Sequence, residues 1–235
     1  MTAPILDLHG VESGYGESIV LRRVRLSVEA GSIFVLLGKN GMGKTTLLNT
    51  AMGYLPKRAG SVRIDGRDVT AWPAHRIARL GVAYAAQERA LFGELSVRDN
   101  LRLGLRSDAD FAARFAAVEG YFPVLGARLR QPAGTLSGGE QKMLLVARSL
   151  MQRPKLLLVD EISEGLQPSV VLRLTAALRA ERDAHGTSML LVEQNVQFAL
   201  QVADRYGVLK RGEIVAEGRI TDAADASAIE SHLQL

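Results

Sequence analysis

The chain has 235 residues, of which 47% are hydrophobic and 23% charged, and its formal net charge is +4. This length and composition are sufficient to bury a full core, and the longest uninterrupted aliphatic or aromatic run, Ile33–Leu37, is far shorter than the roughly 20 residues of a membrane-spanning helix. The sequence has no cysteine, which excludes disulfides, thiolate zinc sites and cysteine nucleophiles.

Targeting and charge patterns narrow the classes of partner. Residues 1–9 have neither a basic segment nor a long apolar stretch, so we expect no secretory signal and a cytosolic protein. The charged residues are dispersed, and mild basicity without a cluster does not predict a nucleic-acid partner. The four histidines are too scattered in the sequence to suggest a metal site.

The first part of the chain alternates short β-type stretches with turns. Residues 5–8 and 21–28 predict strands, and Ser13-Gly14-Tyr15-Gly16 predicts a turn between them. Ile33–Leu37 is a continuous apolar strand, of the kind that a parallel sheet buries on both faces, and a glycine loop and a helix over 45–52 follow it. Further on, the pattern predicts a hairpin over 60–68, a helix over 74–80 and a buried strand over 82–84.

Helical periodicity dominates the middle of the chain, and a βαβ pattern returns after it. Residues 141–151 predict a strongly apolar helix, and residues 156–159 and 189–192 predict buried strands around a helix over 169–185. Residues 207–209 and 213–216 predict an antiparallel pair. We therefore predict one α/β domain over 1–235, with a core and an antiparallel β subdomain from 1–86 and 154–235, and an inserted helical subdomain over 87–153.

The loop after the first buried strand has the pattern GxxxxGK[ST] between a strand and a helix, the context that this motif requires. Its glycines let backbone N–H groups turn toward one anion, and the helix N-terminus adds partial positive charge. The lysine can neutralise the β and γ phosphates, and the threonine hydroxyl can ligate Mg²⁺. The loop predicts a triphosphate site with the nucleotide-binding residues Gly38, Asn40, Gly41, Gly43, Lys44, Thr45 and Thr46.

Two adjacent acids, Asp160 and Glu161, follow the apolar run 156–159. The carboxyl end of a parallel strand is where an α/β sheet binds its ligand. Asp160 therefore suits the Mg²⁺ shell with Thr45, and Glu161 is a candidate general base for the water that attacks the γ-phosphate. Upstream, Tyr15 is either an ordinary turn tyrosine or a stacking platform for the base.

A second candidate anion site opens the helix that begins near Ser137. The run Leu136-Ser137-Gly138-Gly139-Glu140-Gln141 combines a serine and two glycines at a helix N-terminus. It is either a capped helix or a contact for the triphosphate of a second chain, because one triphosphate does not need two such ends. The second interpretation predicts a dimeric ATPase with its chains packed head to tail.

The phosphate loop, Gln87, LSGGEQ (136–141) and LLLVDE (156–161) occur in the order and spacing of an ABC transporter ATP-binding subunit, which the chain resembles over nearly its whole length. The resemblance implies that Tyr15 stacks on adenine and that Gln87 contacts Mg²⁺ or water and senses a membrane subunit. It implies that the signature residues Ser137, Gly138, Gly139 and Glu140 contact the partner's γ-phosphate. It also implies ATP hydrolysis that drives a permease at the cytoplasmic face of a bacterial inner membrane, with a solute-binding protein acting indirectly.

A finer resemblance comes from GKNGMGKTTLL, LFGELSVRDNLRLG and LLVEQNVQFALQVADR, which are similar to the short ATPases of bacterial branched-chain amino acid and urea or amide importers. The SEGLQP stretch, 163–168, is more similar to the urea type, and LVEQN to the amino-acid type. We expect a branched-chain amino acid importer. A urea, amide or other amino-acid importer, or a non-transport ABC ATPase, is the alternative.

The chain departs from the family pattern at several positions. Gln194 stands where a switch histidine is usual, and it can donate an amide hydrogen to the γ-phosphate but cannot titrate. We nevertheless expect Gln194 to act with Glu161 in catalysis. Gln167 replaces a usual aspartate, which removes a charge from the dimer contact, and Ile162 replaces a usual proline. We expect these departures to affect the rate rather than nucleotide binding.

Overall fold

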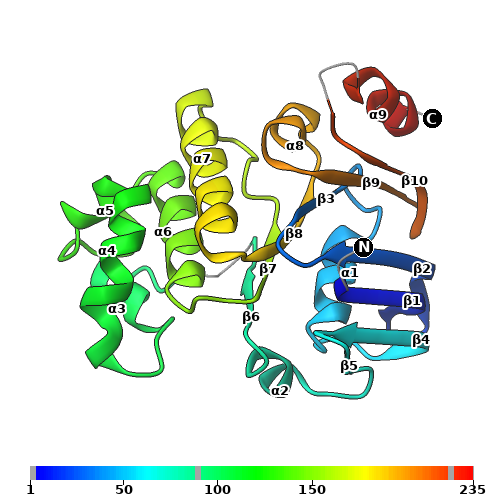
Figure 1. Cartoon of the computed structure of the whole chain (residues 1–235), viewed down its shortest axis with the longest axis horizontal. Coiled ribbons are helices and arrows are strands. Elements are labelled where there is room, and N and C mark those ends of the chain that lie inside the picture. Colours follow the sequence, from blue (N-terminus) through cyan, green and yellow to red (C-terminus); the bar gives the residue numbers. More distant parts are fainter. Residues whose placement is uncertain (1–3, 88–90, 222–224, 235) are drawn as a thin grey trace.

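Two β-sheets frame the protein in the computed structural model, which describes residues 4–87, 91–221 and 225–234 (Figure 1). One is antiparallel, with the strand order β2-β1-β4-β5, and the other is mixed, with the order β10-β9-β3-β8-β7-β6. The strands are β1 Pro4–Tyr15, β2 Ser18–Glu29, β3 Ile33–Leu37, β4 Lys57–Ile64, β5 Arg67–Asp68, β6 Val82–Ala85, β7 Leu156–Asp160, β8 Ser188–Glu193, β9 Arg205–Lys210 and β10 Glu213–Arg219.

Helices connect these strands and cover the mixed sheet (Figure 1). Strands β9, β3, β8, β7 and β6 run parallel, and only the β9–β10 pair of this sheet is antiparallel, as the sequence predicts. The helices are α1 Lys44–Ala51, α2 Ala74–Ala78, α3 Val97–Arg102, η1 Asp108–Asp110, α4 Phe111–Tyr121, α5 Pro123–Gly126, η2 Ala133–Thr135, α6 Gly138–Leu150, α7 Pro168–His185, α8 Val196–Val202 and α9 Asp225–Gln234.

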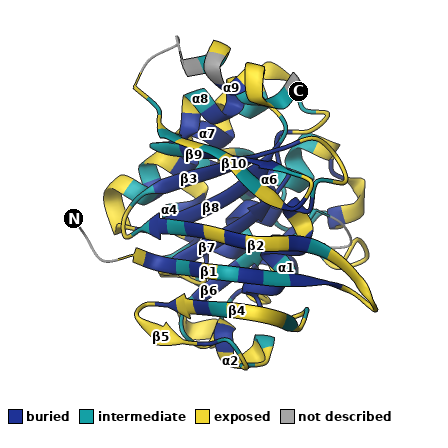
Figure 2. Cartoon of the chain, turned by 90° about the vertical axis from the view of Figure 1, so that its right-hand side faces the viewer, coloured by how far each residue is buried: buried dark blue, intermediate teal, exposed yellow. Residues whose placement is uncertain are grey.

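Alternation along the buried strands divides the interior into two apolar cores. On β3, Phe34 and Leu36 pack with α1 and the antiparallel sheet, whereas Val35 and Leu37 pack with the helices on the other face. All five residues of β3 are buried, as expected for a parallel strand that is covered on both sides. Figure 2 shows this layering: the central strands of the mixed sheet are largely buried, whereas β10 and the strands of the antiparallel sheet are partly exposed.

The N-terminal hairpin differs from its prediction. The strand β1 does not end before Ser13 but continues to Tyr15, and a two-residue turn at Gly16 leads into β2. Register shifts let the long strand stay paired, and Gly10, at φ 62°, lies between two of its paired segments. A Cβ on Gly14 would lie 2.0 Å from the carbonyl oxygen of Ser18, so the glycine permits close strand pairing there rather than a turn.

Helices α3 to α6 lie between β6 and β7 in the chain and gather at one end of the molecule (Figure 1). The helix α6 begins at Gly138 with Ser137 as its N-cap, where the sequence predicts that the segment 136–141 opens a helix, and it buries Met143, Leu144 and Val146 against the sheet and the neighbouring helices. The limits 87 and 153 of the inserted subdomain stay a prediction. Within the described part of the chain, each helix is too short or too polar to cross a membrane.

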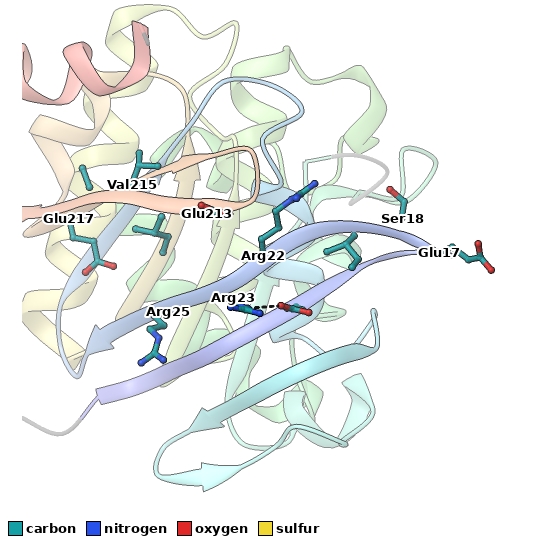
Figure 3. A pocket seen from close by; sticks show the side chains of 12 residues that line it. Glu17, Ser18, Arg22, Arg23, Arg25, Glu213, Val215 and Glu217 are labelled. Carbon is teal, nitrogen blue, oxygen red and sulfur yellow. Dashed lines mark hydrogen bonds and ion pairs between the residues drawn. The ribbon is translucent and has the colours of Figure 1, made fainter.

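A groove of about 1070 Å³ separates the facing edges of the two sheets, between β2 and β10 (Figure 3). Arginines 22, 23 and 25 line it from β2, and Glu213 and Glu217 line it from β10. At one end of the groove, the backbone N–H of Arg22 on β2 donates to the carbonyl of Gly212, in the turn before β10, at 2.8 Å. The predicted nucleotide-binding residues, all of which the structure describes, lie outside the lining of this groove.

Candidate functional site

The glycine loop forms a tight connection between β3 and α1. The backbone N–H of Gly38 donates to the carbonyl of Glu193 at the end of β8, at 3.1 Å. Gly38 also packs so closely on β9 that a Cβ would lie 2.7 Å from the carbonyl oxygen of Leu209. Gly43, at φ 106°, is the N-cap of α1, a backbone conformation that favours glycine. The N–H groups at the start of α1 therefore face the loop, as an anion site requires.

Lys44 is the most constrained side chain of this loop. Its Nζ donates to the carbonyl oxygens of Gly38 at 2.7 Å and Lys39 at 3.1 Å, and it forms an ion pair with Glu161 Oε1 at 2.8 Å. The side chains of Lys44 and Glu161 are only 3% and 6% exposed. Each charge of a buried ion pair needs the other, because an unpaired buried charge is costly. A phosphate that binds Lys44 Nζ therefore has to replace the Glu161 carboxylate as its anionic partner.

Asp160 lies beside the first turn of α1. Leu158 points to the α1 face of the mixed sheet, and the alternation along β7 places Asp160 on the same face. Its Oδ1 accepts a hydrogen bond from Thr45 Oγ1 at 3.2 Å, and its Oδ2 accepts one from the Tyr84 hydroxyl at 3.2 Å. Burial raises the pKa of Asp160, and these two hydrogen bonds oppose the rise.

Glu161 leaves the strand in a left-handed backbone conformation, at φ 46°. Its backbone N–H donates to the carbonyl of Val192, and its own carbonyl accepts from Lys142 Nζ on α6, both at 3.0 Å. Gln87 Nε2 donates to Glu161 Oε2 and to Glu164 Oε2, at 3.0 Å each. Contacts from α1, from α6 and from the segment after β6 therefore hold Glu161, the predicted base, in place.

These groups surround a cleft of about 450 Å³. The phosphate loop, Gln87 and the residues after β7 converge here, and the cleft is lined by Val20, Asn40, Gly41, Gly43, Lys44, Thr45, Thr46, Gln87, Glu161 and Glu164. Of the predicted phosphate-loop and metal residues, Gly38 and Asp160 lie outside this lining. Tyr15 is 51% exposed at the end of β1 and lies outside this lining. Gln194 lies at the rim of the loop, where its Nε2 donates to Asn40 Oδ1 at 2.7 Å.

The Ser137–Glu140 segment caps α6 and lies outside the cleft lining. Ser137 Oγ accepts from the backbone N–H of Glu140, and Glu140 Oε2 accepts from the backbone N–H of Ser137 at 2.9 Å, which completes a capping box. Hydrogen bonds from Ser137 and the charge of Arg128 lower the pKa of Glu140. A Cβ on Gly138 would meet no atom within 4 Å, so this helix end has an open approach.

The donor set at α1 and β7 fits a magnesium ion. Thr45 and Asp160 offer a hydroxyl and a carboxylate whose oxygens lie 3.2 Å apart. Thr45 and Gln87 line the cleft, and Asp160 is buried behind Thr45. Mg²⁺ prefers oxygen ligands and is usually held by one or two carboxylates together with substrate phosphates. The described residues contain no group of three or more histidines and acids that could hold a metal without such a substrate.

Sequence reasoning missed several side chains that shape the site, among them Tyr84, Lys142 and Glu193. Glu193 ends β8 and is buried, and it accepts hydrogen bonds from the backbone N–H of Ser163 at 3.0 Å and from its hydroxyl at 2.7 Å. The sequence signal that could have identified Glu193 is a glutamate at the end of an otherwise apolar predicted strand. The contact fastens the segment after Glu161 to the strand beside the phosphate loop.

The buried Glu193 carboxylate predicts a pH-dependent stability. Burial raises its pKa from 4.5 to about 7, with a smaller contribution from the Glu161 charge and against the hydrogen bonds from Ser163 and Gln194. Between these two values the unfolded chain releases the proton while the folded chain keeps it, so this group makes the fold less stable as the pH rises from 4.5 to 7. Glu193→Gln removes the titration and keeps hydrogen-bonding groups for Ser163.

We therefore expect the stability of Glu193→Gln, relative to the wild type, to rise across this pH window by up to about 3 kcal/mol and to stay constant above it. Urea unfolding at a series of pH values measures the difference. Glu213→Gln, at an exposed carboxylate in the groove of Figure 3, is the matched control and should show no such trend. A difference between Glu193→Gln and the wild type that is the same at every pH would contradict this assignment.

The fold and the cleft together define a P-loop α/β nucleotide-binding protein. The family model described as "ABC transporter" matches residues 21–164, and the chain belongs to the ABC transporter family as its ATP-hydrolysing subunit. Over nearly the whole chain, the structure is similar to a nucleotide-free ATP-binding cassette from an ABC transporter, with a TM-score of 0.87, 24% identity, and 97% of this chain and 95% of that chain covered. It is also similar to an ATP-binding cassette in its ADP conformation, with a TM-score of 0.85, 25% identity, and coverage of 98% and 96%.

Similar sequences are transport ATPases with different substrates. A high-affinity branched-chain amino acid transport ATP-binding protein, BraG of Pseudomonas aeruginosa, is 39% identical over 90% of this chain and 91% of its own length. A probable branched-chain amino acid transport ATP-binding protein, LivF of Archaeoglobus fulgidus, is 32% identical over 94% of both chains. The lipopolysaccharide export system ATP-binding protein LptB of Escherichia coli is 35% identical over 92% of this chain and 91% of its own length.

Proposed function

We propose that this chain binds Mg²⁺–ATP in the cleft beside α1 and hydrolyses it to power an importer of branched-chain amino acids. The main support for an ATP site is the ion pair between Lys44 Nζ and the Glu161 carboxylate, at 2.8 Å, in a cleft lined by the phosphate loop. The cation of the loop and the base that follows β7 are thereby within reach of the same phosphoryl group. In this proposal the nucleotide-binding residues are Gly38, Asn40, Gly41, Gly43, Lys44, Thr45 and Thr46, with Tyr15 at the adenine.

Lys44 and Glu161 have linked roles in this proposal. Phosphate oxygens of ATP take the place of Glu161 Oε1 on Lys44 Nζ, and a charge-assisted hydrogen bond of this kind is short and strong. The carboxylate that is released can then accept a proton from the attacking water, a contribution of about 10²–10⁴ in rate. Gln87, which donates to both Glu161 and Glu164, holds the base toward the cleft.

Thr45 and Asp160 hold the metal in this proposal, with Gln87 at the edge of its shell. When bound, Mg²⁺ neutralises charge that develops on the β and γ phosphates. The chain's own contribution is the placement of the two oxygens by α1 and β7. The hydrogen bond between Thr45 Oγ1 and Asp160 Oδ1 supports the pairing of these two residues.

A second ATP-binding subunit, identical or related, completes the site. The Ser137–Glu140 helix end is open and lies outside the chain's own cleft, so it suits the γ-phosphate held by a partner that packs head to tail. ATP favours the closed pair because ADP cannot bridge both chains. Gln194, held by Asn40 at the loop rim, supplies an amide to the γ-phosphate where a histidine is usual in the family.

The exposed ring of Phe92 is the candidate contact for a membrane permease. Asn100 is fully buried, and it accepts from the backbone N–H of Phe92 at 3.0 Å and donates to its carbonyl at 2.9 Å. These two bonds fix the backbone while 58% of the Phe92 residue stays exposed. The segment follows Gln87 in the chain, so motion of the permease can reach the base through Gln87. The proposal implies a location at the cytoplasmic face of the membrane, with a solute-binding protein acting indirectly.

The similarity to BraG and LivF, over at least nine-tenths of the chain, supports branched-chain amino acids as the transported solute. The similarity to LptB is nearly as extensive, so lipopolysaccharide export is a competing candidate. Urea or amide import is the alternative that the SEGLQP stretch favours. Residues of the ATP cleft do not contact the solute in this proposal, so partner chains decide among these candidates.

We expect the complex that contains this chain to take up leucine. Tagged Glu161→Gln protein, purified with ATP from gently solubilised membranes, identifies the permeases by mass spectrometry. The wild-type complex with these permeases and its solute-binding protein is then reconstituted in proteoliposomes. ATP-driven uptake of labelled leucine, competed by isoleucine and valine but not by urea, is the expected result. Urea uptake, lipopolysaccharide-export components, or ribosomal proteins in the purified complex would overturn the proposed solute.

A further inference from the structure

Tyr84 reaches the Asp160 carboxylate from a neighbouring strand. It is the third residue of β6, and the parallel register pairs it with Leu158, two residues before Asp160 on β7. Side chains of paired residues on adjacent strands share a face, so Tyr84, Leu158 and Asp160 all lie on the α1 side of the sheet. The phenol is long enough to reach the strand end, where its hydroxyl lies 3.2 Å from Asp160 Oδ2.

The ring of Tyr84 packs against the apolar core and against a second aromatic ring. Its aromatic body packs against the apolar core under α1, and the ring of Tyr54, which follows α1 in the chain, lies 6.3 Å from it, centre to centre. The hydroxyl is therefore presented to Asp160 by a rigid aromatic group on an ordered strand. A phenol keeps its proton at neutral pH, so the Tyr84 hydroxyl is a donor to Asp160.

Two hydroxyls fix the two oxygens of Asp160. Thr45, from α1, donates to Oδ1, and Tyr84, from β6, donates to Oδ2. With 1% of Asp160 exposed, water contributes little to orienting the carboxylate. Loss of the Tyr84 hydroxyl would leave one buried carboxylate oxygen without its donor, and the carboxylate would gain freedom to turn away from Thr45.

We propose that Tyr84 is a positioning residue for magnesium, which orients Asp160 so that Oδ1 faces the Thr45 hydroxyl. This inference rests on the assignment of Asp160 and Thr45 to Mg²⁺ in the proposed function. Hydrogen-bond partners of a metal-binding side chain set its orientation, and their loss typically lowers metal affinity by about 10–100-fold. Tyr84 touches neither the nucleotide nor the attacking water in this account.

The variant Tyr84→Phe tests the proposal because it keeps the ring and removes only the hydroxyl. Fluorescence titration with mant-ADP in excess Mg²⁺ and in EDTA separates metal-dependent from metal-independent nucleotide binding. Titration of Mg²⁺ at fixed mant-ADP gives the half-saturating metal concentration. We expect this concentration to rise about tenfold or more in Tyr84→Phe, with affinity in EDTA unchanged within about twofold.

Matched variants make each outcome decisive. Tyr54→Phe removes a hydroxyl from the adjacent ring, which is exposed and makes no hydrogen bond to the described residues, and it should behave as wild type. The positioning role would be overturned if Tyr84→Phe lost mant-ADP affinity equally with and without Mg²⁺, or if it lost no affinity at all. Asp160→Asn tests the underlying assignment: if it leaves the Mg²⁺ dependence intact, the proposed metal site itself fails. If only Asp160→Asn changes that dependence, the Tyr84 inference fails alone.

Discussion

Glu161→Gln is expected to abolish steady-state ATP turnover while ATP binding is retained or strengthened. The amide cannot accept the proton of the attacking water, and loss of a general base typically lowers the rate by about 10²–10⁴-fold. The same change removes the carboxylate that competes with phosphate for Lys44 Nζ, now 2.8 Å away. The glutamine oxygen still accepts from Lys44 Nζ, whereas its amide nitrogen takes the place of the oxygen that accepts from Gln87, so that one contact is lost. Slow hydrolysis with tight binding should trap the ATP-bound dimer.

A steady-state ATPase assay measures the turnover, nucleotide titration measures ATP binding, and size-exclusion chromatography with ATP detects the trapped dimer. Glu213→Gln, the same chemical change on the exposed wall of the groove in Figure 3, should hydrolyse ATP at the wild-type rate and form no trapped dimer. Wild-type turnover in Glu161→Gln would rule out Glu161 as the base. Lost turnover with weakened ATP binding would contradict the competition between Glu161 and phosphate.

Local motifs were predictable from the sequence because neighbouring residues carry them. The phosphate loop needs only a buried strand, glycines and a helix start, and the structure places these at β3, Gly43 and α1. The paired acids need only the end of an apolar strand, which is β7. The turn expected at Ser13–Gly16 comes later, at Gly16 and Glu17, because Ser13, Gly14 and Tyr15 belong to a long irregular strand, and composition alone does not distinguish a bulged strand from a turn.

Contacts between distant residues were not predictable, because they depend on strand order and register. The order β3-β8-β7-β6 places β8 between the phosphate-loop strand and the strand of the acids. Hydrophobic alternation predicts which face a residue takes but not which strands are neighbours. The hydrogen bond from Tyr84 to Asp160, 76 residues apart in sequence, and the anchoring of Ser163 by Glu193 follow from that order and are therefore visible only in the structure.

Lys44→Ala is expected to lower ATP affinity on the order of 10- to 100-fold, because hydrogen bonds to charged groups contribute about 1.5–3 kcal/mol each. It should also destabilise the fold, since it leaves Glu161 buried without its cation, and removal of one member of a buried pair typically costs about 3–5 kcal/mol. The hydrogen bonds from Gln87 and the cleft's exposure to solvent place the expected loss at the lower end of that range. Nucleotide titration and urea unfolding measure the two effects separately.

The double variant Lys44→Ala with Glu161→Gln separates phosphate binding from folding. It removes the orphaned carboxylate, so we expect much of the lost stability to return while ATP affinity stays low. Lys39→Ala, in the same loop but with its side chain exposed and outside the cleft lining, should keep both properties near wild type. If the double variant recovers affinity together with stability, Lys44 serves the fold and not the phosphates. If Lys44→Ala binds ATP as tightly as wild type, the phosphate cradle lies elsewhere.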